Sequence, residues 1–466
     1  MKYIKNSNYR LLNTKDTYFL VDITEKNYGK SEKILQLNES AKKIWEYLDI
    51  YNNEEEIAKG LFNENDNLFS LEEIQDNVKS IIEILGQKGA ICDYEPIGLD
   101  VEIKANSFGA FKAKMAQFRQ PLIGVVEITP YCNFSCPHCY VKGFKNVEVL
   151  GIDQYKEIAK ILRKKGIINV TITGGEPISH PQFKEIYMAF KNEGFLIDIF
   201  TNASLIDKDM AVFLSKYPPR SIDITLYGTS NEEYLKFTGV NDAFSKVINA
   251  MEYLTKYQIF FTTKMILNVN NYDHLDEYNQ LALKYNAPFR YNVVIGKGNN
   301  TLKSGDEIAL TSDKIIEIES QDPLRCKIFK CLATECNNLP YDCLDGNGWS
   351  QYPCLAGIDK VFIGYNGNMS PCVTLRNKGL NIFEHGYDNI WNYWGEKRKE
   401  KLPKEFKCME CKYFPICTPC TEEFEQINGD KTMPIESRCE LAKLRWEKYI
   451  GESVNKTMKK SRLKNK

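Results

Sequence analysis

Three cysteines in one short run are the residues best suited to chemistry in this chain. The run reads Thr129-Pro-Tyr-Cys-Asn-Phe-Ser-Cys-Pro-His-Cys-Tyr140, so Cys132, Cys136 and Cys139 have the spacing C-x3-C-x2-C directly after an apolar stretch at residues 122–128. A [4Fe–4S] cluster needs four ligands, and three local cysteines leave one iron free to bind another molecule. Zinc is the alternative, but structural zinc usually uses two nearby C-x2-C pairs, and the next cysteine is Cys326.

A second motif, Thr171-Ile-Thr-Gly-Gly-Glu-Pro177, follows a β-branched run at residues 167–173 and precedes a helical pattern at residues 183–192. Glycines at the end of a strand let a ligand approach the backbone closely. Glu176 is then placed to accept a hydrogen bond from a ligand ammonium group. Taken alone, the motif also fits an ordinary turn.

Together the two motifs resemble those of the radical S-adenosylmethionine enzymes. In that family the open iron chelates the amino and carboxylate groups of the cofactor's methionine end, and a Gly-Gly-Glu-Pro motif binds the amino group. The resemblance implies one [4Fe–4S] cluster on the three cysteines and S-adenosyl-L-methionine as cofactor. The implied cofactor contacts in these two motifs are Tyr140, Gly174, Gly175, Glu176 and Pro177.

The elements that must position these motifs alternate between strand and helix over residues 121–305. Repeated β-α units predict an α/β fold with a parallel sheet and right-handed crossovers. Six units are too few to close an eight-stranded barrel, and they resemble the open, partial (β/α)6 TIM-like barrel of the radical family, which holds ligands at the carboxyl ends of its strands. Strands are expected at residues 122–128, 168–173, 196–201, 222–226, 259–267 and 289–295, and helices at 153–165, 183–192, 208–216, 243–256 and 274–285.

Two further strand ends carry polar side chains that are plausible cofactor contacts. Asn202 follows the third predicted strand, and Thr225 lies at the end of the fourth in the run Thr225-Leu-Tyr-Gly228. Simple strand capping explains either residue equally well.

Cysteine density rises after residue 295. A stretch from Cys354 to Cys372 reads as a hairpin around Asn366-Gly367, and it is followed by Cys408-x2-Cys411-x5-Cys417-x2-Cys420 and Cys439. This layout resembles the SPASM domain, a C-terminal module with two auxiliary [4Fe–4S] clusters, which we assign to residues 306–450. The resemblance gives one cluster to Cys408, Cys411, Cys417 and Cys439, and most of the other to Cys354, Cys372 and Cys420.

The fourth ligand of the second auxiliary cluster is open. Cys343 is the best candidate, with Cys326, Cys331 and Cys336 behind it, and an open iron fits equally well. A zinc ribbon is the alternative for the paired cysteines, because four-cysteine zinc sites use the same half-motifs.

Residues 1–95 form a different domain. Short strands are expected at residues 9–12, 18–23 and 33–37, followed by three amphipathic helices, which is a winged-helix-like arrangement. The stretch from Leu35 to Asp49 resembles the PqqD-like RiPP recognition elements, which bind a leader peptide as an added strand. DNA binding is disfavoured, because the last helix carries Glu72, Glu73, Asp76 and Glu83 against two lysines. Residues 96–120 read as a linker and residues 451–466 as a basic tail.

Composition limits the remaining possibilities. A chain of 466 residues is expected to fold into two or three domains. Its net charge of −1 gives no basic surface for nucleic acid, which is not an expected partner. No apolar run predicts a membrane span, and the polar start does not resemble a signal peptide. The chain therefore reads as cytosolic, and in that reducing compartment its 15 cysteines favour metal ligation over disulfides. With four histidines, sulfur is the expected ligand type, which favours iron–sulfur clusters or zinc.

The three parts together resemble a radical SAM/SPASM peptide maturase, an oxidoreductase of the sactipeptide and ranthipeptide type. The expected reaction uses a 5'-deoxyadenosyl radical to form a cysteine thioether, a sactionine or ranthionine, in a ribosomally synthesised precursor whose leader binds to residues 1–95. A flavodoxin or ferredoxin is the expected electron donor. The alternatives are a carbon–carbon cross-link, epimerisation, a sulfatase-maturing oxidation, or an iron–sulfur redox regulator. The sequence names neither the precursor nor a catalytic side chain.

Overall fold

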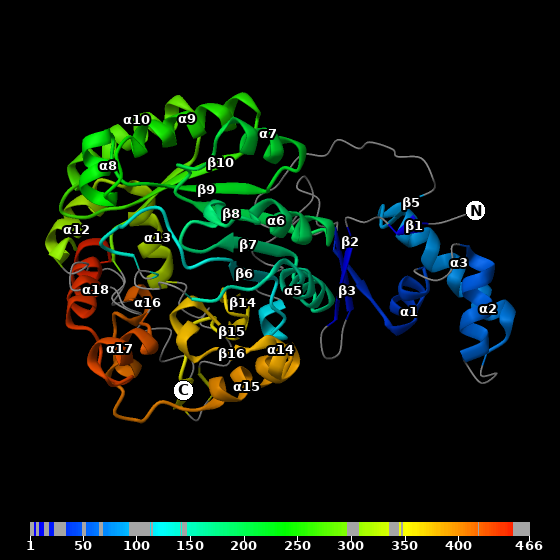
Figure 1. The fold of residues 1–466 in the computed structure, drawn as a ribbon. Helices are drawn as coiled ribbons and strands as arrows, with labels where there is room; N and C mark the ends of the chain where they lie inside the picture. Colours follow the sequence, from blue (N-terminus) through cyan, green and yellow to red (C-terminus); the bar gives the residue numbers. More distant parts are fainter. Residues whose placement is uncertain are drawn as a thin grey trace.

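The computed structural model describes residues 4–5, 9–13, 18–22, 34–48, 53–64, 69–92, 112, 115–139, 141, 147–295, 307–334, 344–345, 348–417 and 419–450. These residues form a central barrel-like body, an N-terminal sheet with helices beside it, and a C-terminal domain below it in the view of Figure 1.

The body is built on a sheet of nine strands in the order β11-β10-β9-β8-β7-β6-β14-β15-β16. Its first six strands are parallel and confirm the six predicted β-α units. They are β6 (Ile123–Glu127), β7 (Asn169–Thr173), β8 (Leu196–Thr201), β9 (Ser221–Leu226), β10 (Phe261–Ile266) and β11 (Phe289–Asn292). The crossover helices are α5 (Ile152–Lys164), α6 (Phe183–Asn192), α7 (Lys208–Lys216), α8 (Asn231–Thr238), α9 (Ala243–Lys256) and α10 (Leu275–Lys284), with short 3-10 turns η2 (Pro177–Ser179) and η3 (Tyr272–His274).

The two faces of the parallel sheet differ sharply in polarity. Ile172, Ile199 and Ile222 lie in register on one face and are fully buried in the main hydrophobic core, which the crossover helices cover. Thr171 and Asp198 are paired on the opposite face. Parallel strands are usually apolar on both faces, so the polar face indicates the side on which a ligand binds.

The structure adds two features to the predicted barrel. Helix α8 begins after Ser230, whose side chain accepts a hydrogen bond from the backbone of Glu233, and ends at Gly239 in the left-handed conformation. The hairpin predicted around Asn366-Gly367 is present as β14 (Lys360–Ile363) and β15 (Asn368–Ser370). Strand β14 also pairs in parallel with β6, and β15 pairs with β16 (Leu380–Asn381), so the C-terminal part extends the barrel sheet.

The N-terminal domain contains the three strands and three helices that the sequence predicts. Strands β2 (Tyr9–Asn13), β3 (Tyr18–Asp22) and β4 (Ile34–Leu37) form an antiparallel sheet in that order, followed by α1 (Glu39–Tyr47), α2 (Glu54–Glu64) and α3 (Leu71–Gln87). A separate two-stranded pair joins β1 (Ile4–Lys5) to β5 (Ile91–Cys92). A capping box between Ser70 and Glu73 starts α3.

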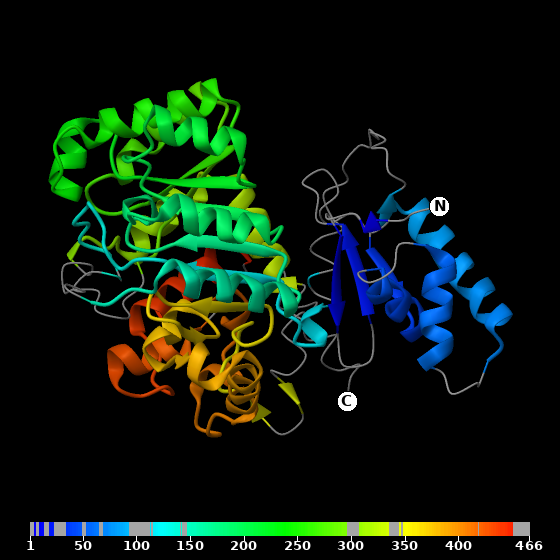
Figure 2. The same ribbon diagram turned by 45° about the vertical axis from the view of Figure 1, so that its right-hand side comes forward.

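The N-terminal sheet lies between its own helices and the barrel, as both ribbon views show (Figures 1 and 2). Leu20 belongs to the cluster packed on α1 and α3, whereas Phe19 and Val21 pack with Met115, Leu122 and Ile168 at the start of the barrel strands. This alternation follows from the period of two along a strand. The Arg10 guanidinium donates to the carbonyls of Glu193 and Gly194, just after α6, at 3.0 and 2.9 Å.

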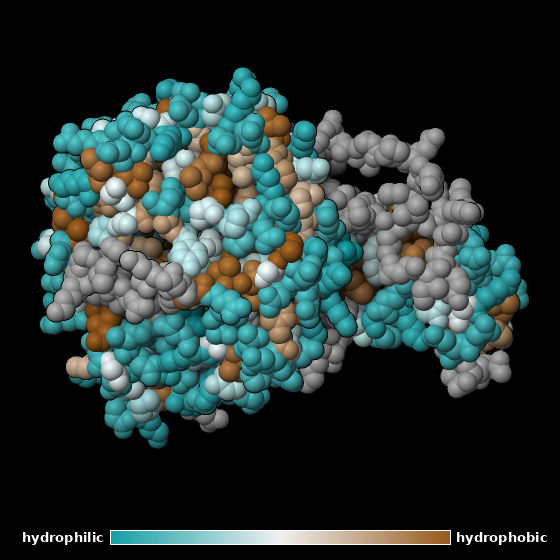
Figure 3. All heavy atoms as spheres, viewed as in Figure 1, coloured by the Kyte–Doolittle hydropathy of each residue, from teal (hydrophilic) through white to brown (hydrophobic). Residues whose placement is uncertain are grey.

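The C-terminal domain is mainly helical. Its elements are α12 (Ser312–Ser320), α13 (Pro323–Thr334), β12 (Leu344–Asp345), β13 (Gly348–Trp349), η5 (Val373–Lys378), α14 (Ile382–His385), α15 (Tyr387–Lys399), η6 (Lys407–Glu410), α16 (Phe414–Cys417), α17 (Thr421–Asn428) and α18 (Glu436–Tyr449). On the face shown in Figure 3, hydrophilic side chains dominate over this domain, while apolar ones gather over the barrel. No helix in the described part of the chain has the length and hydrophobicity that crossing a membrane requires.

Candidate functional site

One cavity of about 590 Å³ on the polar face of the barrel gathers most of the predicted radical-site residues. Its lining comes from the loop after β6 and from the carboxyl-terminal parts of β7 to β11. Seven predicted residues line it, namely Cys132, Cys136, Cys139, Gly174, Gly175, Asn202 and Thr225. Tyr140 lies outside the described residues.

The cysteine loop is held by hydrogen bonds to neighbouring elements. Cys132 Sγ accepts from the backbone N–H of Phe134 at 3.4 Å and from Asn202 Nδ2 at 3.8 Å. Asn202 Nδ2 also donates to Asn133 Oδ1 at 2.9 Å, and the backbone N–H of Ser135 donates to the Thr238 carbonyl of α8 at 2.8 Å. Strand β8 and helix α8 therefore fix the loop before any metal is bound.

The donor set suits an iron–sulfur cluster. Burial raises the pKa of the Cys132 thiol to about 12 and raises the pKa of Cys136 further, and the neighbouring cysteines of the loop raise both. At neutral pH these thiols are protonated, so iron binding must displace their protons. The N–H donors on Cys132 would then stabilise the thiolate.

The glycine motif packs against the cysteine loop backbone to backbone. The N–H of Gly175 donates to the Thr129 carbonyl at 2.7 Å, and that of Glu176 donates to the Tyr131 carbonyl at 2.8 Å. A Cβ atom on Gly174 would collide with Thr129 O, and one on Gly175 with the carbonyl of Tyr131. The glycines therefore give room first to the cysteine loop, in addition to any ligand.

Glu176 does not line the cavity, because its side chain supports the wall from behind. It is fully buried, with Oε1 accepting from Thr201 Oγ1 at 2.7 Å and from the Ile178 N–H at 3.1 Å, and Oε2 accepting from the Asn202 N–H at 2.8 Å. Burial raises the pKa of this carboxyl to about 7. Pro177 is buried at the start of η2 and is likewise absent from the lining.

Asn202 both caps its strand end and faces the cavity. Its Oδ1 accepts from the backbone N–H and the hydroxyl of Ser204 at 3.0 and 2.7 Å, which is a local turn contact. Its Nδ2 reaches Cys132 in the cysteine loop. The capping and ligand-binding interpretations of this residue are thus compatible.

Several lining residues were not singled out in the sequence. Tyr227 packs edge-on against Phe134, with ring centroids 5.8 Å apart, and stacks on Phe237 at 5.6 Å. Lys264 and Arg290 line the far wall on β10 and β11. Polar periodicity gives no clear signal for them, because Phe261-Thr-Thr-Lys-Met-Ile266 has three polar residues in succession.

In each of two groups of C-terminal cysteines, neighbouring thiols raise the pKa of other members. Burial raises the pKa of Cys408 to about 12 and that of Cys417 to about 11, and Cys411 and Cys439 raise both further. Burial raises the pKa of Cys420 to about 12, with Cys354 and Cys372 contributing to it. The structure thus brings Cys420 close enough to the hairpin cysteines for them to raise its pKa.

The structure does not identify a fourth ligand for the second auxiliary cluster, which the sequence gives to Cys354, Cys372 and Cys420. Cys343 and Cys336 lie outside the described residues, as does the side chain of Cys331. Cys326, which belongs to helix α13, packs against the apolar cluster of Phe329, Trp446 and Tyr449. In the parts of the chain that the structure describes, no three His, Cys, Asp or Glu side chains are arranged to hold a single metal ion.

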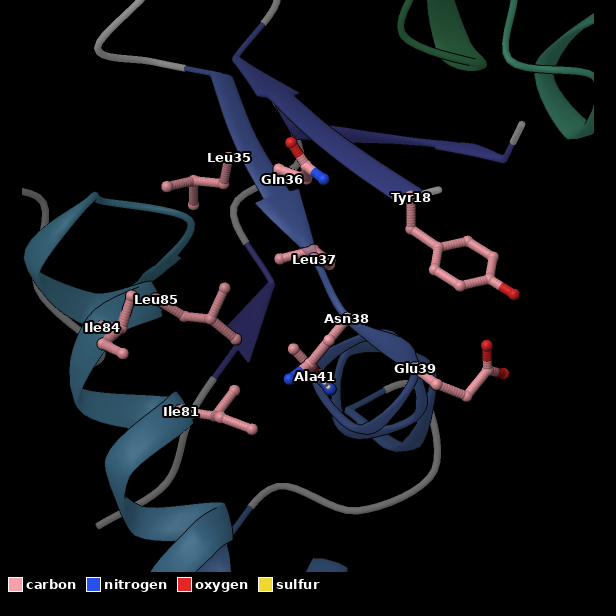
Figure 4. A pocket seen from close by; sticks show the side chains of 10 residues that line it. All are labelled: Tyr18, Leu35, Gln36, Leu37, Asn38, Glu39, Ala41, Ile81, Ile84 and Leu85. Carbon is pink, nitrogen blue, oxygen red and sulfur yellow. Dashed lines mark hydrogen bonds between the residues drawn. The ribbon is translucent and has the colours of Figure 1, made fainter. Parts of the chain in front are cut away.

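A second concave site, a groove of about 900 Å³, lies on the N-terminal domain between strand β4 and helix α3. Figure 4 shows Leu35 and Leu37 of β4 facing Ile81, Ile84 and Leu85 of α3, while Tyr18 lies on the other side of the strand. Strand β4 is the edge of its sheet. An open strand edge beside apolar pockets is the geometry that binds an extended peptide.

Comparison with known families identifies the barrel. Residues 126–282 match the family model of the Radical SAM superfamily. This stretch contains the cysteine loop, the glycine motif and strands β7 to β10, so the barrel is a radical SAM domain. The family implies a [4Fe–4S] cluster and S-adenosylmethionine.

Curated relatives have related but distinct activities. The antilisterial bacteriocin subtilosin biosynthesis protein AlbA of Bacillus subtilis is 27% identical over 285 residues, covering 59% of this chain and 60% of AlbA. The chain thus spans less than two thirds of that relative. The AdoMet-dependent heme synthase of Methanosarcina barkeri is 22% identical over 338 residues, covering 68% of this chain and 95% of the synthase.

Solved structures share the fold over a larger part of the chain. SuiB of Streptococcus suis, crystallised with the precursor peptide SuiA, superposes with a TM-score of 0.62 at 16% identity and covers 94% of this chain and all of SuiB (100%). The enzyme anSMEcpe with bound AdoMet has a TM-score of 0.53 at 17% identity, covering 72% of this chain and 98% of its own. At these identities the likeness establishes the fold.

Proposed function

We propose that this chain is a radical S-adenosylmethionine oxidoreductase that modifies a ribosomally synthesised precursor peptide. The observation that carries the proposal is the single cavity in which the three loop cysteines meet Gly174 and Gly175 and the polar strand ends. Two relatives add support: AlbA is named for the biosynthesis of a bacteriocin, and SuiB was crystallised with a precursor peptide.

Residues of this chain supply the binding surfaces for the cofactors. Cys132, Cys136 and Cys139 would hold a [4Fe–4S] cluster, and S-adenosylmethionine would lie against the glycine pair, Asn202 and Thr225. When bound, the cluster and S-adenosylmethionine together supply a 5'-deoxyadenosyl radical that abstracts hydrogen from an unactivated carbon. The barrel aligns that carbon and excludes water. Glu176 contributes indirectly, because it holds the backbone of Asn202 in the cavity wall.

We assign residues 1–95 to leader binding in a winged-helix-like, PqqD-like domain. The leader would add a strand at the edge of β4 and place alternate side chains in the groove between Leu37 and Ile84. DNA binding finds less support, because Glu72, Glu73, Asp76 and Glu83 of α3 are exposed.

For the product we propose a thioether between a peptide cysteine and a carbon of another residue. The two C-terminal cysteine sets would hold the auxiliary clusters of a SPASM domain, which bind a substrate thiolate or accept the electron released on bond formation. A flavodoxin or ferredoxin in the cytoplasm would supply the first electron. A carbon–carbon cross-link or epimerisation would use the same machinery, whereas a sulfatase-maturing oxidation leaves the N-terminal groove without a role.

The radical assignment is tested by changing Cys132, Cys136 and Cys139 together to alanine. Anaerobically reconstituted triple variant should lose about four irons and form no 5'-deoxyadenosine from S-adenosylmethionine under a chemical reductant. Cys92→Ala in strand β5 (Ile91–Cys92) of the N-terminal domain serves as the control and should keep both. A triple variant that still cleaves the cofactor would overturn the assignment.

The peptide assignment is tested on the short open reading frames that neighbour this gene. Co-expression with a cysteine-bearing candidate should yield a peptide lighter by two hydrogens that no longer reacts with a thiol-alkylating reagent, as a thioether requires. A product lighter by two hydrogens with all thiols free would identify a carbon–carbon cross-link. An unmodified peptide in every case would contradict the peptide proposal and leave the radical assignment intact.

A further inference from the structure

Lys264 occupies an unusual position for a lysine. It lies in the middle of β10, in register with Thr225 of β9 and Arg290 of β11 on the polar face of the sheet. All three residues line the cavity. Its neighbours in the strand, Thr263 and Met265, are buried.

Among the described residues, no carboxylate forms an ion pair with the ammonium group of Lys264, although Asp223 acts on it at longer range. Its Nζ lies 3.7 Å from the centroid of the Phe200 ring, and among the described residues no oxygen accepts a hydrogen bond from it. The neighbouring Arg290 is different, because it forms an ion pair with Asp223. Asp223 Oδ1 is further occupied by the hydroxyl of Thr262 at 2.7 Å.

The charges around the cavity are unbalanced. Of the described residues that line it, the charged ones are Lys264 and Arg290, and none is a carboxylate. Burial lowers the pKa of Lys264 to about 8, an effect that Asp223 opposes and Arg290 reinforces. Lys264 is half-buried, and a partly desolvated ammonium is costly unless an anion pairs with it.

We propose that Lys264 is the binding residue for a carboxylate of the molecule that occupies this cavity. The inference rests on the proposed function for the identity of that molecule. Two sources carry the required chemistry: the methionyl carboxylate of S-adenosylmethionine, or an acidic side chain of the peptide close to the carbon that is modified. Arg290, held by Asp223, would flank the same group.

Binding experiments on the reconstituted full-length enzyme test this site without relying on turnover. The variants are Lys264→Met, which keeps the length and apolar stem of the side chain, Lys264→Arg, which keeps the charge, and Lys256→Met at the exposed end of α9 as a matched control. Each is titrated with S-adenosylmethionine and with decarboxylated S-adenosylmethionine. N-acetyl-aspartate N-methylamide and its asparagine analogue are then compared by saturation-transfer NMR with the cofactor present.

The two sources give different results. If the cofactor supplies the carboxylate, Lys264→Met weakens S-adenosylmethionine binding about tenfold or more and leaves the decarboxylated cofactor unchanged. If the peptide supplies it, cofactor affinities stay unchanged, and the blocked aspartate binds the wild type and Lys264→Arg but not Lys264→Met, while the blocked asparagine binds none. Lys256→Met should match the wild type throughout.

Failure of this inference is separate from failure of the proposed function. If the wild-type enzyme binds the cofactor, and Lys264→Met changes the binding of neither S-adenosylmethionine nor the blocked aspartate, the carboxylate site alone is overturned. Wild-type enzyme that binds no S-adenosylmethionine would contradict the proposed function. Lys264→Gln provides a second neutral variant if Lys264→Met fails to fold.

Discussion

Gly175 shows how one residue without a side chain can position the cysteine loop that follows the neighbouring strand. Its N–H donates to Thr129, and the next residue donates to Tyr131, so the glycine motif supports the cysteine loop directly. A substitution there acts on the cluster site before it acts on the cofactor.

We therefore expect Gly175→Val to lower the iron content. The new side chain would overlap the carbonyl of Tyr131 and displace the loop that carries Cys132. Reconstituted protein should lose about four irons together with cofactor cleavage. Gly151→Ala is the control, because the nearest atom to its Cβ would be Gln154 Oε1 at 3.9 Å. Full iron with weakened cofactor binding would instead show that the glycine contacts only the ligand.

At this scale the sequence predicts loop residues better than strand residues. The cysteines and Gly174-Gly175 belong to a spaced motif that tightly constrains a short loop, and the structure places them in one cavity. Lys264 and Tyr227 belong to no such motif, because Lys264 follows two threonines within β10 and Tyr227 directly follows the end of β9. Their meeting depends on strand register, which a local pattern does not encode.

Among the elements, periodicity predicts most of the helices and strands well, because each packs one face against the core. Helix α8 is an exception: it is short, and its run reads as easily as a ligand loop. The pairing of β14 with β6 is another, since it joins residues far apart in the chain. The sequence predicts the hairpin, but only the tertiary contact shows that the C-terminal domain continues the barrel sheet.

The groove between β4 and α3 can be tested by one surface substitution. Ile84 lines it and is 49% exposed, so Ile84→Asp should leave the domain folded while placing a charge where an apolar leader side chain docks. Leader affinity should fall about tenfold or more by isothermal titration. Phe69→Asp is the matched control, because Phe69 is 57% exposed and lies outside the groove. Equal losses of leader affinity in the two variants would show that the groove does not bind the leader.

For the whole molecule, the N-terminal sheet is a structural layer as well as a candidate peptide site. It covers Met115, Leu122 and Ile168 of the barrel with Leu12, Phe19 and Val21. Deleting residues 1–95 would expose this apolar surface, so a truncated enzyme would combine loss of leader binding with loss of stability. Surface variants separate the two effects.

The three cysteine groups should behave as independent iron sites. Cys417→Ala and Cys372→Ala belong to different C-terminal sets, and each should remove about four irons. Both variants should still form 5'-deoxyadenosine, since that reaction belongs to the barrel, but neither should release modified peptide. Product formation by either variant would assign its set a structural role.

The buried ion pair between Glu127 and Arg376 joins the barrel to the C-terminal domain. Glu127 ends β6 shortly before the cysteine loop, and Arg376 lies in η5 shortly after Cys372, with side chains 1% and 6% exposed. Above about pH 7, where Glu127 is ionised, removing one partner leaves the other charge uncompensated, so Arg376→Met should lower the free energy of unfolding there by about 3–5 kcal/mol. The double variant Glu127→Gln/Arg376→Met should recover part of that loss.

The pH dependence of this loss distinguishes an ionic link from simple packing. Burial raises the pKa of Glu127 to about 7 despite Arg376, whereas its unfolded value is about 4.3. The folded state thus retains the proton between these values, and the contribution of Glu127 to stability falls as pH rises through that window. Without Arg376 the folded pKa rises further, so the penalty of Arg376→Met should be small near about pH 5.5 and grow above about pH 7. Urea unfolding of both single variants and the double variant at the two pH values measures the coupling. Additive losses that do not change with pH would show that the two side chains stabilise the junction by packing alone.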